Sequence, residues 1–391
     1  MRVLVTAIAQ PNGISGVQRH ALNLVRCLLQ RAEITSVHLA LAPWQLNLPA
    51  VAGLEPEDRL HIQTATVKRG SISRNLWHLR ELPKLARAVE ADLVHLGYPV
   101  PFRRNAMPCP VVMTLHDLYP FDIPGNFGFP QVILNRFILR LALGQADAIS
   151  CVSRTTLRHL QYLGYQGKAS RFIPNCVEPG PANSARGPLL DWNGESFLLA
   201  VAQHRRNKNL DLLLRSFRNL LDSGLLPRAA RLVIVGMRGP ETPKLHALAQ
   251  QLGVTSHVDF LEGLSEAELQ WCYRHCASVI APSSIEGFGL PVVEARLAGC
   301  RVVCSDIPAF RELTGSQVHF FDLHGNAERN LCMAIADAIA GPRPIPELLP
   351  EFQKNTVAGS HIELYQATLG PHPLDAHIVP IESPVKERQF L

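Results

Sequence analysis

The stretch that decides the fold is Ser278–Ser305, SVIAPSSIEGFGLPVVEARLAGCRVVCS. Its first five residues are apolar and partly β-branched, which predicts a strand buried on both faces of a parallel sheet. Gly287 and Gly289 indicate a sharp turn, and Pro291 is expected to be the first residue of a helix that ends at Gly299. A strand, a glycine turn and a helix N-terminus in this order direct backbone N–H groups toward one point, where an anion such as phosphate binds.

Two carboxylates complicate a simple phosphate site. Glu286 stands in the turn and Glu294 follows in the helix, so both side chains are expected to face one cleft without touching. Carboxylates accept hydrogen bonds from hydroxyl groups, which indicates ribose and sugar hydroxyls on the same ligand as the phosphate. The alternative is that Glu286 is an ordinary loop carboxylate and Glu294 only favours an N-terminal helix turn. Spacing alone does not decide between the two.

The run from Ile285 to Leu313, IEGFGLPVVEARLAGCRVVCSDIPAFREL, resembles the signature of the retaining family 4 glycosyltransferases. Two glutamates separated by seven residues mark that family, whose GT-B fold is an α/β architecture of two Rossmann-like, doubly wound domains facing a central cleft. The resemblance implies that Glu286 contacts hydroxyls of the donor sugar and that Glu294 contacts the ribose. The diphosphate would then be held by the turn N–H groups of Phe288, Gly289 and Leu290. Arg301, close behind the helix, is a departure from the family pattern.

Three further segments match that family. Gly13 and Gly16 lie between an N-terminal strand and a helix, where two glycines alone are a weak signal; in the family, the equivalent loop closes over the donor phosphates from the opposite domain. His116 belongs to the sequence THD at the end of a predicted strand, where open α/β sheets place ligands, and the resemblance implies contact with the donor sugar near the reaction centre.

Lys208 matches the lysine that neutralises the leaving diphosphate in the family. The arginine that usually accompanies it stands where this chain has Gln203, so Arg205 or Arg206 is expected to replace it. The alternative is that this RRNK turn is merely a solvated surface.

The length and the alternation of elements predict two domains with parallel sheets, since 391 residues exceed one core. We expect residues 1–180 to form an acceptor-side domain and residues 190–345 to form the donor domain, joined by a linker rich in Pro, Gly and Ser at 178–188. A helix at 350–370 is expected to cross back to the first domain, and 371–391 to form an irregular tail. Residues 121–129 are expected to form an irregular loop beside an acceptor pocket.

The composition excludes several classes of protein. No apolar run reaches the roughly 18 residues of a membrane span, and the first residues lack the flanks of a signal peptide, which predicts a cytoplasmic protein. The nine cysteines stand singly, which argues against a disulfide framework or structural zinc; those between positions 272 and 304 are expected to be buried as small apolar residues. There is no Asp-x-Asp motif to hold a divalent cation against a diphosphate, so no metal and no cofactor are expected.

The charge is uneven along the chain. Residues 1–177 carry 19 Lys plus Arg against 10 Asp plus Glu, and the remainder carries 19 against 23. This balance indicates an anionic surface or acceptor on the first half, without the dense basic and aromatic cluster of a nucleic-acid site. Within it, Val67–Val89 is basic and amphipathic. The segment is either a peripheral contact on the inner face of a membrane or a solvated surface helix, which Pro83 would interrupt.

These features together predict a retaining, metal-independent glycosyltransferase. It would move a hexose-type sugar from a nucleotide diphosphate sugar to a glycan, a lipid-linked glycan or a polysaccharide precursor. A nucleotide-sugar epimerase with the same fold would need no acceptor. A non-catalytic nucleotide-sugar-binding protein would keep the fold and lose the polar site.

Overall fold

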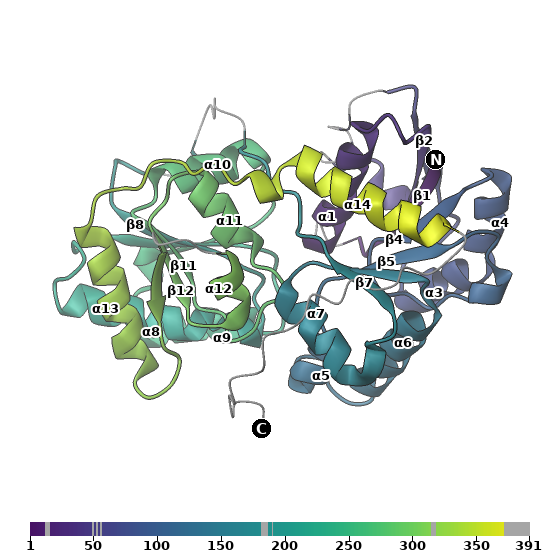
Figure 1. Cartoon of the computed structure of the whole chain (residues 1–391). Helices are drawn as coiled ribbons and strands as arrows, with labels where there is room; N and C mark the ends of the chain where they lie inside the picture. The colour runs from purple at the N-terminus through teal and green to yellow at the C-terminus, as the bar shows by residue number, and fades with distance from the viewer. Residues whose placement is uncertain are drawn as a thin grey trace.

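The computed structural model describes residues 1–370 except 12–15, 49–50, 52–53, 55–56, 181–186, 190 and 314–317. Gly13, most of the expected linker and the expected tail lie outside these residues. The described chain forms two parallel sheets with helices on their faces (Figure 1), which confirms the predicted α/β architecture of two doubly wound units.

The first sheet has seven strands in the order β3-β2-β1-β4-β5-β6-β7, all paired in parallel. Its strands are short and apolar, and all five residues of β5 are buried, as expected where helices cover both faces. The strands are β1 (Arg2–Thr6), β2 (Ser36–Leu41), β3 (Leu60–Thr64), β4 (Leu93–Leu96), β5 (Val111–Leu115), β6 (Ala148–Cys151) and β7 (Ala169–Phe172).

The second sheet has six strands in the order β10-β9-β8-β11-β12-β13, also parallel. They are β8 (Phe197–Val201), β9 (Arg231–Val235), β10 (Val258–Leu261), β11 (Ser278–Ala281), β12 (Val302–Ser305) and β13 (Val318–Phe321). In both sheets the strand order reverses beside the first strand, between β1 and β4 and between β8 and β11. Ligands of open α/β sheets bind outside the carboxyl ends of the strands at such a reversal.

Helices cover both sheets. The first sheet is covered by α1 (Gly16–Leu29), α3 (Ser71–Arg80), α4 (Leu82–Ala88), α5 (Tyr119–Asp122), α6 (Gln131–Gln145) and α7 (Arg154–Leu160). The second carries α8 (Leu210–Asp222), α9 (Thr242–Gln251), α10 (Glu266–His275), α11 (Leu290–Leu297), α12 (Pro308–Leu313) and α13 (Ala327–Ala340). None of the described helices is both long and apolar enough to span a membrane.

The last helix, α14 (Lys354–Leu369), returns to the first sheet and packs on α1 (Figure 1). Val357, Ile362 and Tyr365 are buried in the same core cluster as β1 and α1. The Tyr365 hydroxyl lies 2.6 Å from His95 Nδ1 in β4. The two halves of the chain are therefore tied together by a helix that lies after both sheets in sequence.

Several local predictions need correction. Pro291 is the second residue of α11, because Leu290 comes first, and the helix ends at Leu297, two residues before Gly299. Residues 121–129 are not irregular throughout, since they include the end of α5 and a 3-10 turn at Pro124–Asn126.

Side-chain packing explains two features that the sequence left open, the basic segment 67–89 and the charge of Arg301. The basic segment 67–89 is divided at Glu81 into α3 and α4, and Trp77 and Leu82 lie in the core. Arg301, unexplained in the sequence, donates to the backbone carbonyl of Gly341 at 3.0 and 2.8 Å and so fixes the end of α13. The four cysteines between positions 272 and 304 are buried, as predicted.

Candidate active site

Two glycines shape the turn between β11 and α11. Gly289 has φ 108°, and a Cβ there would lie 2.7 Å from the Phe310 ring. A Cβ at Gly287 would lie 1.8 Å from the backbone carbonyl oxygen of His116, in the other half of the chain. Both positions therefore exclude a larger side chain. The turn consequently lies directly against the carboxyl end of β5.

Glu286 lies in this turn at the centre of a polar cluster. Its Oε1 is 2.5 Å from Lys208 Nζ and accepts a hydrogen bond from Ser283 Oγ at 2.8 Å. Its Oε2 is 3.3 Å from the hydroxyl of Tyr119, which comes from α5 of the facing domain. The side chains of Glu286 and Lys208 are only 11% and 18% exposed, so neither belongs to a freely solvated loop.

Lys208 reaches Glu286 because its turn is bonded to the turn after β11. Asn207 is buried; its Nδ2 donates to the Ile285 carbonyl at 3.3 Å, and its carbonyl accepts from Ser284 N at 2.9 Å. Asn209 adopts a left-handed conformation with φ 46° and donates to the Pro282 carbonyl at 2.9 Å. Asparagine tolerates this conformation better than most residues. The interpretation of RRNK as a merely solvated turn is therefore wrong for Lys208.

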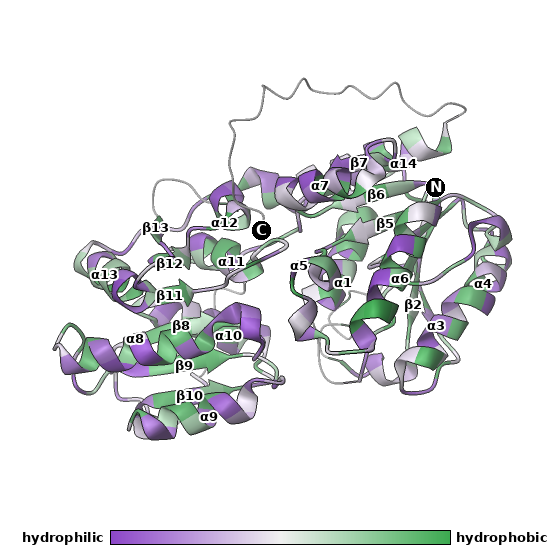
Figure 2. Ribbon diagram, turned by 90° about the horizontal axis from the view of Figure 1, so that it is seen from below, coloured by the Kyte–Doolittle hydropathy of each residue, from purple (hydrophilic) through white to green (hydrophobic). Residues whose placement is uncertain are grey.

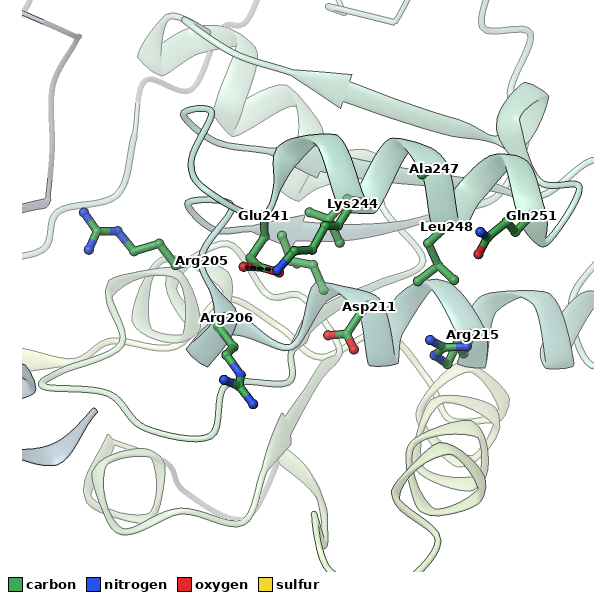
Figure 3. A pocket seen from close by; sticks show the side chains of 11 residues that line it. Arg205, Arg206, Asp211, Arg215, Glu241, Lys244, Ala247, Leu248 and Gln251 are labelled. Carbon is green, nitrogen blue, oxygen red and sulfur yellow. Dashed lines mark hydrogen bonds and ion pairs between the residues drawn. The ribbon is translucent and has the colours of Figure 1, made fainter. Parts of the chain in front are cut away.

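Arg205 and Arg206 diverge (Figure 3). Arg205 is half-buried, its Nε donates to the Gln203 side chain at 2.9 Å, and its charge acts on Asp117 in the cleft. Arg206 is exposed, and both arginines line a hollow between α8 and α9. Because Arg205 also acts on Asp117, whose pKa Lys208 influences too, we expect Arg205 to assist Lys208, and this role stays a prediction.

Glu294 is buried in α11 and bonded from both halves of the chain. Tyr273 donates to its Oε2 at 2.7 Å, and Arg19 NH1 of α1 donates to its Oε1 at 2.9 Å. Arg19 also pairs with Glu266 at 2.9 Å. The carboxylate therefore does more than favour a helix N-terminus, since it is one end of an ion pair that joins the two domains.

His116 packs at the carboxyl end of β5 as a neutral ring. Burial lowers its pKa to about 4. Its Nε2 lies 2.9 Å from the Gly97 carbonyl, so Nε2 carries the proton and Nδ1 is the acceptor. The ring of His20 stands edge-on to it, with centroids 4.7 Å apart. A hydroxyl group is the natural partner for the free lone pair of Nδ1.

A buried polar chain continues behind His116. His20 Nε2 and His95 Nε2 lie 3.2 and 2.8 Å from the hydroxyl of Thr114, and His95 also contacts Tyr365 of α14. His361 packs against His95, with ring centroids 5.4 Å apart. Burial lowers the pKa of each of these histidines. The helix that crosses back is thus linked to the strand that carries His116.

The backbone at the start of α11 is suited to an anion. Among the described residues, no backbone hydrogen bond is found for the N–H groups of Phe288, Gly289 or Leu290. The Phe288 side chain is buried against Phe352, with ring centroids 5.7 Å apart. A Cβ at Gly16, where α1 begins, would lie 3.8 Å from Leu290 Cδ1, so the N-terminus of α1 lies at the same point. The diphosphate roles of these residues stay predictions.

Sequence reasoning missed the residues that hold the site together. Tyr119, Asn207, Asn209, Arg19 and Tyr273 were not singled out, although each contacts or positions Glu286, Lys208 or Glu294. The asparagines flanking Lys208 were a usable signal, because asparagine is common in turns and at left-handed positions. Nothing local marked Arg19 or Tyr273, whose partner is far away in the sequence.

We expect Arg19→Gln to destabilise the protein by about 1–3 kcal/mol, because it leaves the buried Glu294 carboxylate without its charged partner. Urea unfolding measures the change. Arg158→Gln is the matched control, because Arg158 also pairs across the domains, with Glu312 at 3.4 Å, but is 66% exposed and should cost less than about 0.5 kcal/mol. Equal losses in the two variants would contradict a special role for the Arg19 pair.

Two facing, doubly wound domains, with polar side chains meeting between their sheets, define the GT-B class of α/β proteins. Residues 14–180 match the family model "Glycosyltransferase Family 4", and residues 186–355 match "Glycosyl transferases group 1". The chain belongs to glycosyltransferase family 4.

Two curated relatives match part of the chain. The O-antigen chain mannosyltransferase RfbU of Salmonella typhimurium is 26% identical over 217 residues, which are 55% of this chain and 56% of the relative. O-antigen chain mannosyltransferase B of Escherichia coli is 30% identical over 218 residues, 52% of this chain and 55% of the relative. The chain thus spans little more than half the length of the curated relatives it matches.

The solved structures extend the likeness of fold to nearly the whole chain. WaaG, a glycosyltransferase involved in lipopolysaccharide biosynthesis, and Anabaena Alr3699/HepE in complex with UDP and glucose each superpose with a TM-score of 0.65. Each is 17% identical, and each match covers 94% of this chain and 97% of the other.

Proposed function

We propose that the protein transfers a hexose-type sugar, with retention at the anomeric carbon and without a metal ion, from a nucleotide diphosphate sugar to a glycan, lipid-linked glycan or polysaccharide precursor. The observation that carries the proposal is the contact between Lys208 and Glu286, at the point where the strand order of the second sheet reverses. The hydroxyl of Tyr119, from the first domain, contacts Glu286 there as well. The mannosyltransferase names of the relatives make a mannose donor the first to test.

The residues suit charge separation at a leaving diphosphate. When the bond between the anomeric carbon and the phosphate oxygen breaks, negative charge grows on that oxygen. The acceptor hydroxyl oxygen forms the new bond to the anomeric carbon, and its proton passes to the departing diphosphate. Lys208, Arg205 and the N–H groups at the start of α11 would stabilise this charge, because preorganised donors lower the barrier most where charge develops. Glu286 and the Nδ1 of His116 would accept from sugar hydroxyls, and Glu294 from the ribose.

Donor turnover tests the proposal. Purified protein is incubated with nucleotide diphosphate mannose, glucose and galactose, with and without a lipopolysaccharide-derived glycan acceptor, and released nucleotide diphosphate and products are measured. Acceptor-dependent release and a glycosylated product would support it. An isomerised nucleotide sugar from donor alone would indicate an epimerase. Donor binding seen as a thermal shift, without turnover, would indicate a binding protein.

We expect EDTA to leave the rate of transfer unchanged within twofold. The described residues contain no group of three or more His, Cys, Asp or Glu side chains that could hold a metal ion, and leaving-group charge would be met by Lys208 and backbone N–H groups. The rate is measured after chelation and again after addition of Mg²⁺ or Mn²⁺. A rate that collapses and then returns with either ion would overturn metal independence.

Three further expectations are part of the proposal. The basic first domain would contact the acceptor side and an anionic membrane surface, and the protein would act in the cytoplasm. No nucleic acid is expected as a partner.

A further inference from the structure

One helix of the first domain presents a large apolar surface to solvent. Ile133, Phe137 and Leu141 of α6 are exposed at spacings of four residues and share one face of the helix, with Leu134 beside Ile133. Phe129, just before the helix, is exposed as well. The exposed fractions are 83% for Phe129, 56% for Ile133, 49% for Leu134, 59% for Phe137 and 39% for Leu141. Elsewhere in the described chain, exposed large hydrophobic residues occur singly or in pairs. These five residues are called the α6 apolar face.

The exposure is not a result of poor packing. The opposite side of α6 is anchored by Leu139, Ala142 and Leu143, all of which are buried in the first domain's core. A helix with one side in the core normally carries polar residues on the other. An apolar outer side therefore indicates a surface that something else covers.

The charge around the α6 apolar face favours an anionic partner. The helix contains no Asp or Glu and carries Arg136 and Arg140. Their guanidinium groups lie 5.6 and 5.3 Å from the ring centre of Phe121. Lys168 donates to the Ala146 carbonyl at the end of the helix, adding a third cation.

The nearby carboxylates offset these cations little. Asp147 already lies 2.6 Å from Arg104 Nε. Burial raises the pKa of Asp122 to about 7, so this carboxyl group is partly protonated near neutral pH. The exposed Arg140 is therefore available to a negatively charged surface, whereas the half-buried Arg136 donates to the Pro120 carbonyl at 2.7 Å.

The α6 apolar face is also close to the candidate active site. Helix α6 packs against α5, and Figure 2 shows α5 on the side of the first domain that faces the second. The first residue of α5, Tyr119, contacts Glu286. A surface that holds α6 would therefore lie beside the entrance to the polar cluster.

We propose that the α6 apolar face docks on a lipid bilayer that contains anionic lipids. An apolar face bordered by arginines is the pattern of a helix that lies in the plane of the membrane interface. The expected alternative surface, segment 67–89, buries Trp77 and Leu82 in the core and offers less apolar area. Docking would bring a lipid-linked acceptor to the cleft, and this part of the inference rests on the proposed function. The docking of α6 on the bilayer does not depend on the proposed function.

Vesicle flotation tests the docking surface. The intact protein is mixed with vesicles of phosphatidylcholine alone or of phosphatidylcholine with phosphatidylglycerol. Ile133→Ser combined with Phe137→Ser should lower binding to the anionic vesicles by at least about tenfold, because less apolar area is buried. The matched control is Ile72→Ser with Leu76→Ser on α3, two residues that are 76% and 42% exposed, and it should bind as the unaltered protein does.

Charge is tested separately with Arg140→Gln, which should weaken binding to anionic vesicles and reduce its sensitivity to salt. Failure of the unaltered protein to float, or equal loss in the α3 control, would overturn the proposal. Dimers in vesicle-free solution that the α6 variant abolishes would identify self-association instead. Donor turnover with an added water-soluble glycan acceptor is measured on the same samples, so loss of flotation and failure of the enzymatic proposal are seen independently.

Discussion

Lys208→Ala is expected to lower kcat by about 100-fold or more while changing the donor's dissociation constant much less. Its ammonium is in contact with Glu286 and would face the leaving diphosphate, where negative charge grows toward the transition state. Loss of one preorganised donor costs about 3 kcal/mol in the barrier. Single-turnover kinetics and donor titration, measured on the same samples, separate the two effects; a rise in KM alone would indicate uniform binding.

The surface lysine Lys244 supplies the matched control. It also pairs with a glutamate, Glu241 at 3.0 Å, but is 74% exposed, so Lys244→Ala should leave kcat unchanged. Arg205→Ala should lose activity and combine non-additively with Lys208→Ala, because both would act on one charge. Arg206→Ala should behave as the Lys244 variant does. Near-normal kinetics for the Lys208 variant, with an unchanged melting temperature, would exclude its proposed role.

Stability should fall as the pH falls below about 6.5. Five histidines are buried with their pKa values lowered by burial: His20, His78, His95, His204 and His361. The pKa of the partly buried His116 is lowered as well. Near pH 7 they are neutral in both states. Below pH 6.5 the unfolded chain binds protons that the folded chain does not, so the free energy of unfolding decreases.

Two carboxyl groups act in the opposite direction. Burial raises the pKa of Asp117 to about 6 and that of Asp122 to about 7, so the folded state holds their protons more tightly. The histidines outnumber them. The free energy of unfolding should therefore fall by at least about 1.4 kcal/mol per pH unit, one net proton, between roughly pH 6 and 4.5. Urea unfolding across this range measures the slope, and a flat or rising profile would contradict it.

His361→Leu isolates one contribution. Neither ring nitrogen of His361 has a hydrogen-bond partner among the described residues, and burial lowers its pKa to about 3. The substitution should reduce the slope of the free energy of unfolding against pH by the equivalent of about one proton. It should raise the free energy of unfolding most at acidic pH. His257→Leu is a suitable control, because His257 is only partly buried at the end of a surface turn.

Much of the fold was predictable because its information is local. Apolar runs such as Val111–Leu115, followed by helical patterns, indicated parallel strands with crossovers, and the turn at Gly287 and Gly289 gave the start of a helix within one residue. A residue's preference for strand, turn or helix is a property of a few neighbours. The predicted ends of helices and strands were less accurate, because the last turn of a helix or the last paired residue of a strand depends on tertiary contacts.

The sequence by itself determined the two-domain architecture and the chemistry of the turn that carries Glu286 and Glu294. Only the tertiary structure decided which groups meet these carboxylates: Lys208 from the turn after β8, Tyr119 from α5, and Arg19 from α1, 275 positions before Glu294. It also placed the larger exposed apolar side on α6 instead of segment 67–89. Contacts between distant residues depend on how two sheets and a returning helix pack, and no local pattern in one sequence encodes that arrangement.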